Sequence, residues 1–333
     1  AVGLMERANC PEAVWFLDDM GSWPATGALG ERMRRTAAKM KLMGIQPACS
    51  VRAVFSHGLM TSSDGAGSRQ VALFFRTPKG GMDTVAVLLK DSVGIKDLIC
   101  VYEDGAEAEE SLRERFDGLP MAPCSLELAR ELINDALACH ARCQTLLPPY
   151  WALCRPYFGP EPFAPEVRVP DLRAYDLEAL SLDEGLLEDS EVMADSYSYG
   201  CFSITSDRAY DFVAGVMPKR ATKLPKAKYA QFLREITPEE QALLLSRMAQ
   251  ALEVEALAGR AVQPLNRMAA GVWWAMKNNI MAFHEVPYIK ALAVVSIEMI
   301  IHNLRMGFRT QAEADQAALE EQLEEDGYWS EDD

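Results

Sequence analysis

The chain has 333 residues, of which 49% are hydrophobic and 25% charged, and its formal net charge is −16 with a pI near 4.8. This length predicts about two domains, and the composition is that of a globular protein rather than a disordered one. The negative field repels polyanions, so we do not expect nucleic acid as the main partner.

The chain begins with two predicted helices, over 11–20 and 27–43. An apolar stripe at helical spacing is predicted on the second: Leu29, Met33, Ala37 and Met40. Gly44 follows where a left-handed helix cap is wanted. The other side of this helix is basic, and we interpret it as a solvated face.

Four runs rich in Val, Leu, Ile and Phe come next, at 51–57, 70–76, 84–90 and 98–102. Turn residues separate them, which is typical of an antiparallel meander. Because Val85 to Leu89 is apolar without alternation, we expect that strand to be central and covered on both faces. The loop from Asp64 to Ser68 lacks the residues of a nucleotide-binding loop and is interpreted as a hairpin tip.

Helices are predicted over 109–116 and 125–146, the second with Ser125 as its N-cap. Four prolines within Gly159–Pro170 exclude regular helix, so 159–175 is predicted to be a domain linker. The acidic segment 176–195 follows, and we expect the basic residues between Lys219 and Lys228 to neutralise it.

We interpret Tyr197–Thr205 as a strand in an otherwise helical half. Thr237-Pro238-Glu239-Glu240 is a strong helix start, with a capping Thr and Pro at the first helical position. Further helices are predicted from Pro264 through Met281 and from Pro287 through Arg305.

The expected fold is therefore α+β, with N-terminal helices and a small antiparallel β-meander followed by a C-terminal α-helical domain. The boundaries we expect are a helix-flanked sheet domain over 1–158, a Pro-rich linker over 159–175, a mainly helical domain over 176–309 and an acidic tail over 310–333. No motif set identifies a family.

The eight cysteines form no CxxC pair, which predicts free thiols in a reducing compartment and a cytoplasmic protein. Cys139, His140 and Cys143 lie close together on one predicted helix, but a closed zinc site needs a fourth ligand and His140 points away from Cys139. We favour buried structural residues and predict no metal and no cofactor. The longest apolar stretch, Ala291–Ile301, is too short for a membrane span.

The tail is the most informative segment, because no Lys or Arg follows Arg309. It carries ten acids: Glu313, Asp315, Glu320, Glu321, Glu324, Glu325, Asp326, Glu331, Asp332 and Asp333. Tyr328 and Trp329 lie inside the last acidic run, where a solvated charge run has no use for large aromatics. We expect these two rings to anchor the tail on a partner.

A large apolar cluster around Trp273 and Trp274 is a second candidate contact, because adjacent helical residues point about 100° apart. One ring is expected in the core and the other at a groove or interface. The leading hypothesis is thus a non-enzymatic protein-binding or regulatory adaptor protein, with a basic protein surface as its partner.

Two alternatives remain. One is a hydrolase or transferase with a site between the two domains, built from His57, His284 and Cys201, although no HExxH or GxSxG motif is present and we predict no catalytic residue. The other is a tail that mimics nucleic acid and blocks a basic site, which predicts strongly salt-dependent binding.

Overall fold

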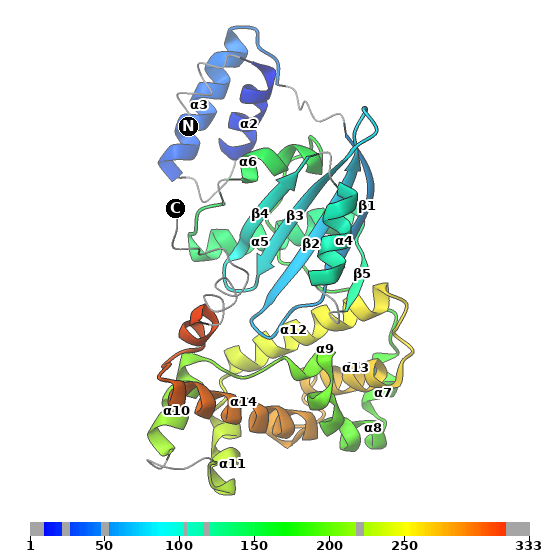
Figure 1. Cartoon of the computed structure of the whole chain (residues 1–333), viewed down its shortest axis with the longest axis vertical. Helices are drawn as coiled ribbons and strands as arrows, with labels where there is room; N and C mark the ends of the chain where they lie inside the picture. The colour runs from blue at the N-terminus through cyan, green and yellow to red at the C-terminus, as the bar shows by residue number, and fades with distance from the viewer. Residues whose placement is uncertain are drawn as a thin grey trace, which may run out of the picture. The chain divides into compact units, whose positions relative to one another are not determined.

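The computed structural model describes residues 10–21, 27–47, 53–102, 105–115, 120–148, 150–217 and 223–317 (Figure 1). The chain divides into two compact units, Ala1–Asp171 and Leu172–Asp333. This division falls inside the segment 159–175 that the sequence predicts to be a linker. Helices, one antiparallel sheet and a helical second half confirm the predicted α+β fold class.

The first unit contains a five-stranded sheet of order β4-β3-β2-β1-β5, in which every pair is antiparallel. Its strands are β1 (Val54–Thr61), β2 (Ser68–Arg76), β3 (Met82–Lys90), β4 (Gly94–Val101) and β5 (Met121–Pro123). Val85–Leu89 lies in β3, which is flanked by β4 and β2 and is therefore an interior strand as expected, although β2 is the middle one. The buried residues of β3 alternate, however: Val85, Val87 and Leu89 are buried, while Ala86 and Leu88 are half-buried.

The described helices of this unit are α2 (Pro11–Gly21), α3 (Gly27–Leu42), α4 (Gly105–Arg115), α5 (Leu126–Cys143), α6 (Trp151–Cys154) and the 3-10 turn η2 (Arg155–Phe158). Figure 1 shows α4 and α5 on opposite sides of the sheet. The alternation of side chains along the strands shows that both faces of the sheet are covered. Asp83 on β3 contacts Tyr157 of η2 on one face, whereas His57 on β1 contacts Glu109 of α4 on the opposite face. Ser125 caps α5 as predicted, with its side chain accepting the N–H of Leu128.

The helix pair α2–α3 has a small core of its own, in which Val14, Leu17, Ala37 and Met40 are fully buried. Leu29 does not join it and is 46% exposed, so the predicted stripe on α3 begins one turn later, at Met33. Gly44 has a φ of 87° and closes α3 in the left-handed region, as predicted.

The described regular secondary structure of the second unit is all helical: α7 (Leu177–Ser181), α8 (Glu184–Glu188), η3 (Asp189–Asp195), α9 (Tyr197–Gly200), α10 (Asp207–Val216), α11 (Lys226–Glu235), α12 (Pro238–Leu257), α13 (Pro264–Lys277), η4 (Phe283–Glu285) and α14 (Pro287–Met306). Its core surrounds α14, where Ile289, Leu292 and Ile297 are fully buried. Thr237 and Glu240 form the predicted capping box of α12.

The strand expected over Tyr197–Thr205 was wrong. Ser196 accepts the N–H of Tyr199 and starts the short helix α9, and the chain then crosses the core irregularly to α10. The N–H of Ile204 donates to Ser296 Oγ at 2.8 Å instead of to a neighbouring strand. Apolar residues there face a helical core, and no described strand of this unit is available for pairing.

Among the described residues, no single helix has the length and apolar content needed to cross a membrane. Taken together, Pro287–Met306 and Gln311–Ala317 reach those limits, but they are bent by 66° at their junction. Most of the predicted tail, including Tyr328 and Trp329, lies outside the described residues.

Candidate functional site

The two adjacent tryptophans of α13 have different surroundings. Trp273 is 6% exposed, its indole N–H donates to the carbonyl of Leu245 at 2.8 Å, and Lys277 Nζ lies 4.5 Å from its ring centroid. Trp274 is half-buried and packs against the same core. Only Trp274 therefore keeps a useful area for a partner.

His57 lies beside a β-bulge. The register of β1 against β2 shifts between Phe55 and His57, so Ser56 is the extra residue. His57 stacks on Phe74, its Nδ1 lies 3.3 Å from Ser56 Oγ, and its Nε2 lies 2.9 Å from a carboxylate oxygen of Glu109. The bulge therefore aims the imidazole at helix α4.

Burial alone would raise the pKa of Glu109, but hydrogen bonds from Arg113 and His57 outweigh it and hold the pKa below its ordinary value. With both partners engaged, this carboxylate anchors α4 to the sheet. The other members of the hydrolase hypothesis lie in the second unit: His284 is exposed on η4, and the Cys201 thiol donates to the carbonyl of Ser198 at 3.9 Å. None of these contacts brings two of the three residues together, so we do not propose that hydrolase.

His140 on α5 has a structural role. It is fully buried, Nε2 accepts the N–H of Ile95 at 2.9 Å, and Nδ1 lies 2.6 Å from Thr145 Oγ1. Both ring nitrogens are therefore used within the fold. The neighbouring thiols of Cys139 and Cys143 point toward the β3–β4 turn instead, with sulfur atoms 3.9 Å apart.

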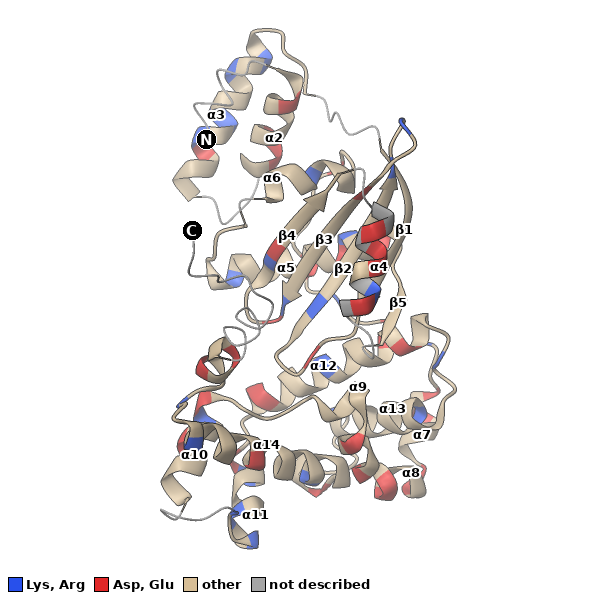
Figure 2. Cartoon of the chain, in the orientation of Figure 1, with Lys and Arg blue, Asp and Glu red and all other residues tan. Residues whose placement is uncertain are grey.

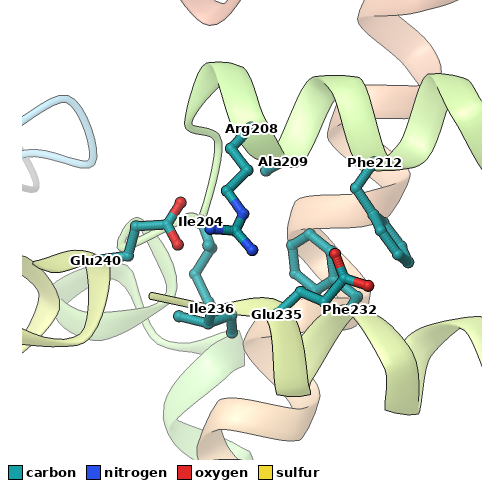
Figure 3. Close-up of a pocket in the computed structure, with 8 residues that line it drawn as sticks. All are labelled: Ile204, Arg208, Ala209, Phe212, Phe232, Glu235, Ile236 and Glu240. Atoms are coloured by element: carbon teal, nitrogen blue, oxygen red, sulfur yellow. The ribbon is translucent and has the colours of Figure 1, made fainter. Parts of the chain in front are cut away.

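A small hollow lies between α10, α11 and the start of α12 in the second unit (Figure 3). Figure 3 shows the Arg208 side chain running from α10 between Glu235 and Glu240, with Phe212 and Phe232 beside it. The space open to the centre of a water molecule is only about 10 Å³, room for roughly one water. This hollow is too small for a typical small-molecule site.

The strongest surface feature of the second unit is a group of acids that we call the acidic surface. It comprises Asp176, Glu178, Asp183, Glu184, Glu188, Asp189, Glu191 and Asp195, all of them exposed. Figure 2 shows acidic bands on α8 and its neighbours. No Lys or Arg occurs between Arg173 and Arg208, so the charge has no compensation within the segment.

Apolar residues between the acids pack the segment onto the core of the unit, and the acids therefore face outward. Leu180, Leu187 and Met193 are buried in the core of the unit. Gly271 on α13 permits the close approach of α7, since a side chain there would place its Cβ 2.7 Å from the carbonyl oxygen of Leu180. Asp176 and Asp183 also cap α7 and α8 through their carboxylates.

The expectation that the basic segment neutralises these acids was wrong for its described residues. Lys223 lies 3.8 Å from Glu298, and Lys228 donates to Gln231. None of the ion pairs formed within the described ranges includes an acid of the acidic surface. Opposite charge blocks pair only when the fold brings them together.

Two large apolar side chains between the acids are exposed, Leu182 by 69% and Val192 by 50%, and Tyr197, two residues after Asp195, is exposed by 61%. Sequence reasoning identified the acidic segment but not these side chains as surface residues. The helical spacing of the buried leucines around them is the pattern from which their exposure could have been predicted.

Comparison of the chain with protein-family models, curated proteins and solved structures finds no match.

Proposed function

We propose that this protein is a binding protein that docks a basic protein surface on its acidic surface, assisted by the acidic, aromatic tail. One observation carries the proposal: eight exposed carboxylates have no ion-pair partner among the described residues, and the exposed apolar side chains of Leu182, Val192 and Tyr197 lie within or directly after this segment. Clustered charge of one sign steers a partner of opposite charge, and Tyr197 supplies the kind of anchor that contributes most to affinity.

A charge-neutralised variant tests this. Glu184→Gln, Glu188→Gln and Glu191→Gln remove three charges and spare the capping residues Asp176 and Asp183. The matched control removes three exposed charges of α4 in the first unit by the same substitution: Glu107→Gln, Glu110→Gln and Glu114→Gln. Both variants change the net charge equally, so a difference between them reports position rather than total charge.

The measurement has two stages. Affinity purification under nuclease treatment identifies proteins retained by the wild-type chain, and the affinity of the purified partner is then measured at several salt concentrations. We expect the acidic-surface variant to bind on the order of tenfold more weakly, from about 0.5 kcal/mol for each exposed charge pair lost. Equal affinity of the acidic-surface variant and the control would overturn the proposal.

The contribution of the tail needs a separate deletion. Tyr210 donates to Gln311 Oε1 at 3.1 Å, so a truncation at 310 would disturb the described fold as well. Removal of 318–333 avoids this contact, and Tyr328→Ser with Trp329→Ser tests the rings alone. Retention of full affinity by both variants would restrict the interface to the acidic surface.

A further inference from the structure

Two thiols of the first unit lie side by side at the C-terminal end of α5. The sulfur atoms of Cys139 and Cys143 are 3.9 Å apart, within hydrogen-bonding distance. Cys139 is buried, whereas Cys143 is exposed, so the pair can be reached from solvent at one of its ends. Neither residue belongs to the acidic surface, and the proposed function does not use them.

The turn between β3 and β4 holds the two sulfur atoms in place. The Cys139 thiol donates to the carbonyl of Asp91 at 3.4 Å, and the Cys143 thiol donates to the carbonyl of Ser92 at 3.6 Å. Two adjacent carbonyl oxygens therefore face the pair, at the end of a helix where the backbone also carries partial negative charge. Such surroundings favour a bound cation.

The distance between the sulfur atoms fits one metal ion held by both. A thiolate sulfur lies about 2.3 Å from an ion of the size of Zn²⁺, and two such bonds at an angle of about 110–120° place the sulfur atoms about 3.8–4.0 Å apart. The observed 3.9 Å falls in this interval. The pair is thus arranged to chelate an ion without any movement of the helix.

A disulfide fits the same pair less well. Residues four apart on a helix have Cβ atoms about 5–6 Å apart, whereas a disulfide needs about 3.5–4.5 Å. Closing the bond would distort the last turn of α5, in which the carbonyl of His140 accepts the N–H of Gln144. A bridging ion spans the longer distance and leaves this turn intact.

The number of available ligands selects the metal. Across the described ranges, no group of three or more His, Cys, Asp or Glu side chains is placed to hold an ion together. His140, between the two cysteines in the chain, uses both ring nitrogens inside the fold. These residues therefore do not supply the four ligands of a closed zinc site. Thiolates also select Cu(I), which is stable with only two or three ligands.

We propose that Cys139 and Cys143 form a two-thiolate site for a Cu(I) ion. As each copper–sulfur bond forms, the S–H bond breaks and its proton passes to solvent, while copper and sulfur keep their oxidation states. Burial, together with the hydrogen bond to Cys143, raises the pKa of Cys139, so this thiol is protonated at neutral pH before copper binds. The two hydrogen bonds to the turn carbonyls are exchanged for two bonds to copper.

The test uses the full chain, reduced and kept free of oxygen, with Cu(I) presented by the coloured chelator bicinchoninate. We expect the wild-type chain to withdraw one Cu(I) per molecule, measured as the loss of absorbance of the chelator complex. Cys143→Ser, at an exposed position, and Cys139→Ser should each bind more than about 100-fold more weakly, because loss of a residue that only supports a metal ligand already costs about 10–100-fold. Cys10→Ser and Cys201→Ser remove half-buried thiols elsewhere in the chain and should bind as wild type.

Alkylation locates the ion. Copper should protect Cys139 and Cys143, but not Cys10 or Cys201, from iodoacetamide, as mapped by peptide mass spectrometry. Zn²⁺ at the same concentration should protect them less, because its remaining ligands are missing. Thermal unfolding shows that each variant is folded. A wild-type chain that withdraws no copper, a Cys143→Ser variant that binds as wild type, or equal protection by both metals would overturn the proposal.

Discussion

Nε2 of His140 on α5 accepts the backbone N–H of Ile95 at 2.9 Å and so ties the long helix of the first unit to the start of β4. The imidazole is fully buried, and burial lowers its pKa below the ordinary value. The bond from the Ile95 N–H requires an unprotonated Nε2, which also lies 3.2 Å from the carbonyl oxygen of Ile95.

This bond predicts a pH dependence of stability. Below about pH 6.5 the unfolded chain binds a proton at His140, whereas the folded chain does not, because its pKa is lower. The free energy of unfolding therefore falls as pH drops from about 6.5 toward the lowered folded pKa. The slope contributed is at most about 1.4 kcal/mol per pH unit. His140→Gln should remove that part of the slope in urea unfolding at pH 7.5, 6.5 and 5.5. Parallel pH curves for wild type and variant would contradict the assignment.

Gly94 gives a steric prediction at the same joint. Its φ is 95°, and a Cβ there would lie 2.4 Å from the carbonyl oxygen of Ala136 and 2.7 Å from Cδ2 of His140. Gly80 has a similar φ of 90° with nothing within 4 Å of the added atom. Gly80→Ala should cost about 1–2 kcal/mol from backbone strain alone. Gly94→Ala should cost at least about 2 kcal/mol more, since the clash adds to the strain. Equal midpoints in thermal unfolding would show that the joint relaxes.

Arg155 gives the largest expected effect. It is fully buried, forms two hydrogen bonds to Asp19 at 2.7 and 2.8 Å, and lies over the rings of Trp15 and Phe163. Arg155→Met removes both of these hydrogen bonds and the buried charge opposite the Asp19 carboxylate, so we expect a loss of about 3–5 kcal/mol in the free energy of unfolding.

The matched control is the exposed pair of Lys41 and Asp18, whose atoms are 2.8 Å apart. Lys41→Met should cost less than about 1 kcal/mol. Hydrogen exchange gives a local check, because Arg155→Met should release the amides of α2 before those of the sheet. Similar losses for both variants would mean that burial adds nothing to the Arg155 contact.

The capping box of α12 gives the fourth prediction. Thr237 Oγ1 accepts the N–H of Glu240 at 3.2 Å, and the Glu240 carboxylate accepts the N–H of Thr237 at 2.7 Å. Thr237→Ala should lower stability by about 1 kcal/mol. Ser246→Ala, on an exposed position of the same helix, should change it by less than about 0.5 kcal/mol. Chemical denaturation of the two variants tests this. Equal stability of the two variants would show that the capping box does not stabilise the protein.

Local chemistry made several parts of the fold predictable. The caps at Ser125 and Thr237 and the left-handed Gly44 depend on residues within one turn of each other, so the order of residues is enough to identify them. The meander was predictable for the same reason, because its turns are short. The strand expected over Tyr197–Thr205 failed because apolar spacing does not show whether a neighbouring strand exists.

The candidate sites depended on tertiary structure much more. The acidic surface was visible as a charged segment, but its lack of compensation follows from where Lys223 and Lys228 lie in the fold. No sequence pattern predicted the bulge at Ser56.

By itself, the order of residues determined the fold class, the helix starts and the total charge of this protein, because these depend on neighbours in the chain or on composition. Only the tertiary structure decided which acids of the acidic surface stay without an ion-pair partner among the described residues and which histidine is buried. Each of those properties depends on the desolvation and hydrogen bonding of a side chain by groups distant in the chain, and packing alone brings such groups into contact.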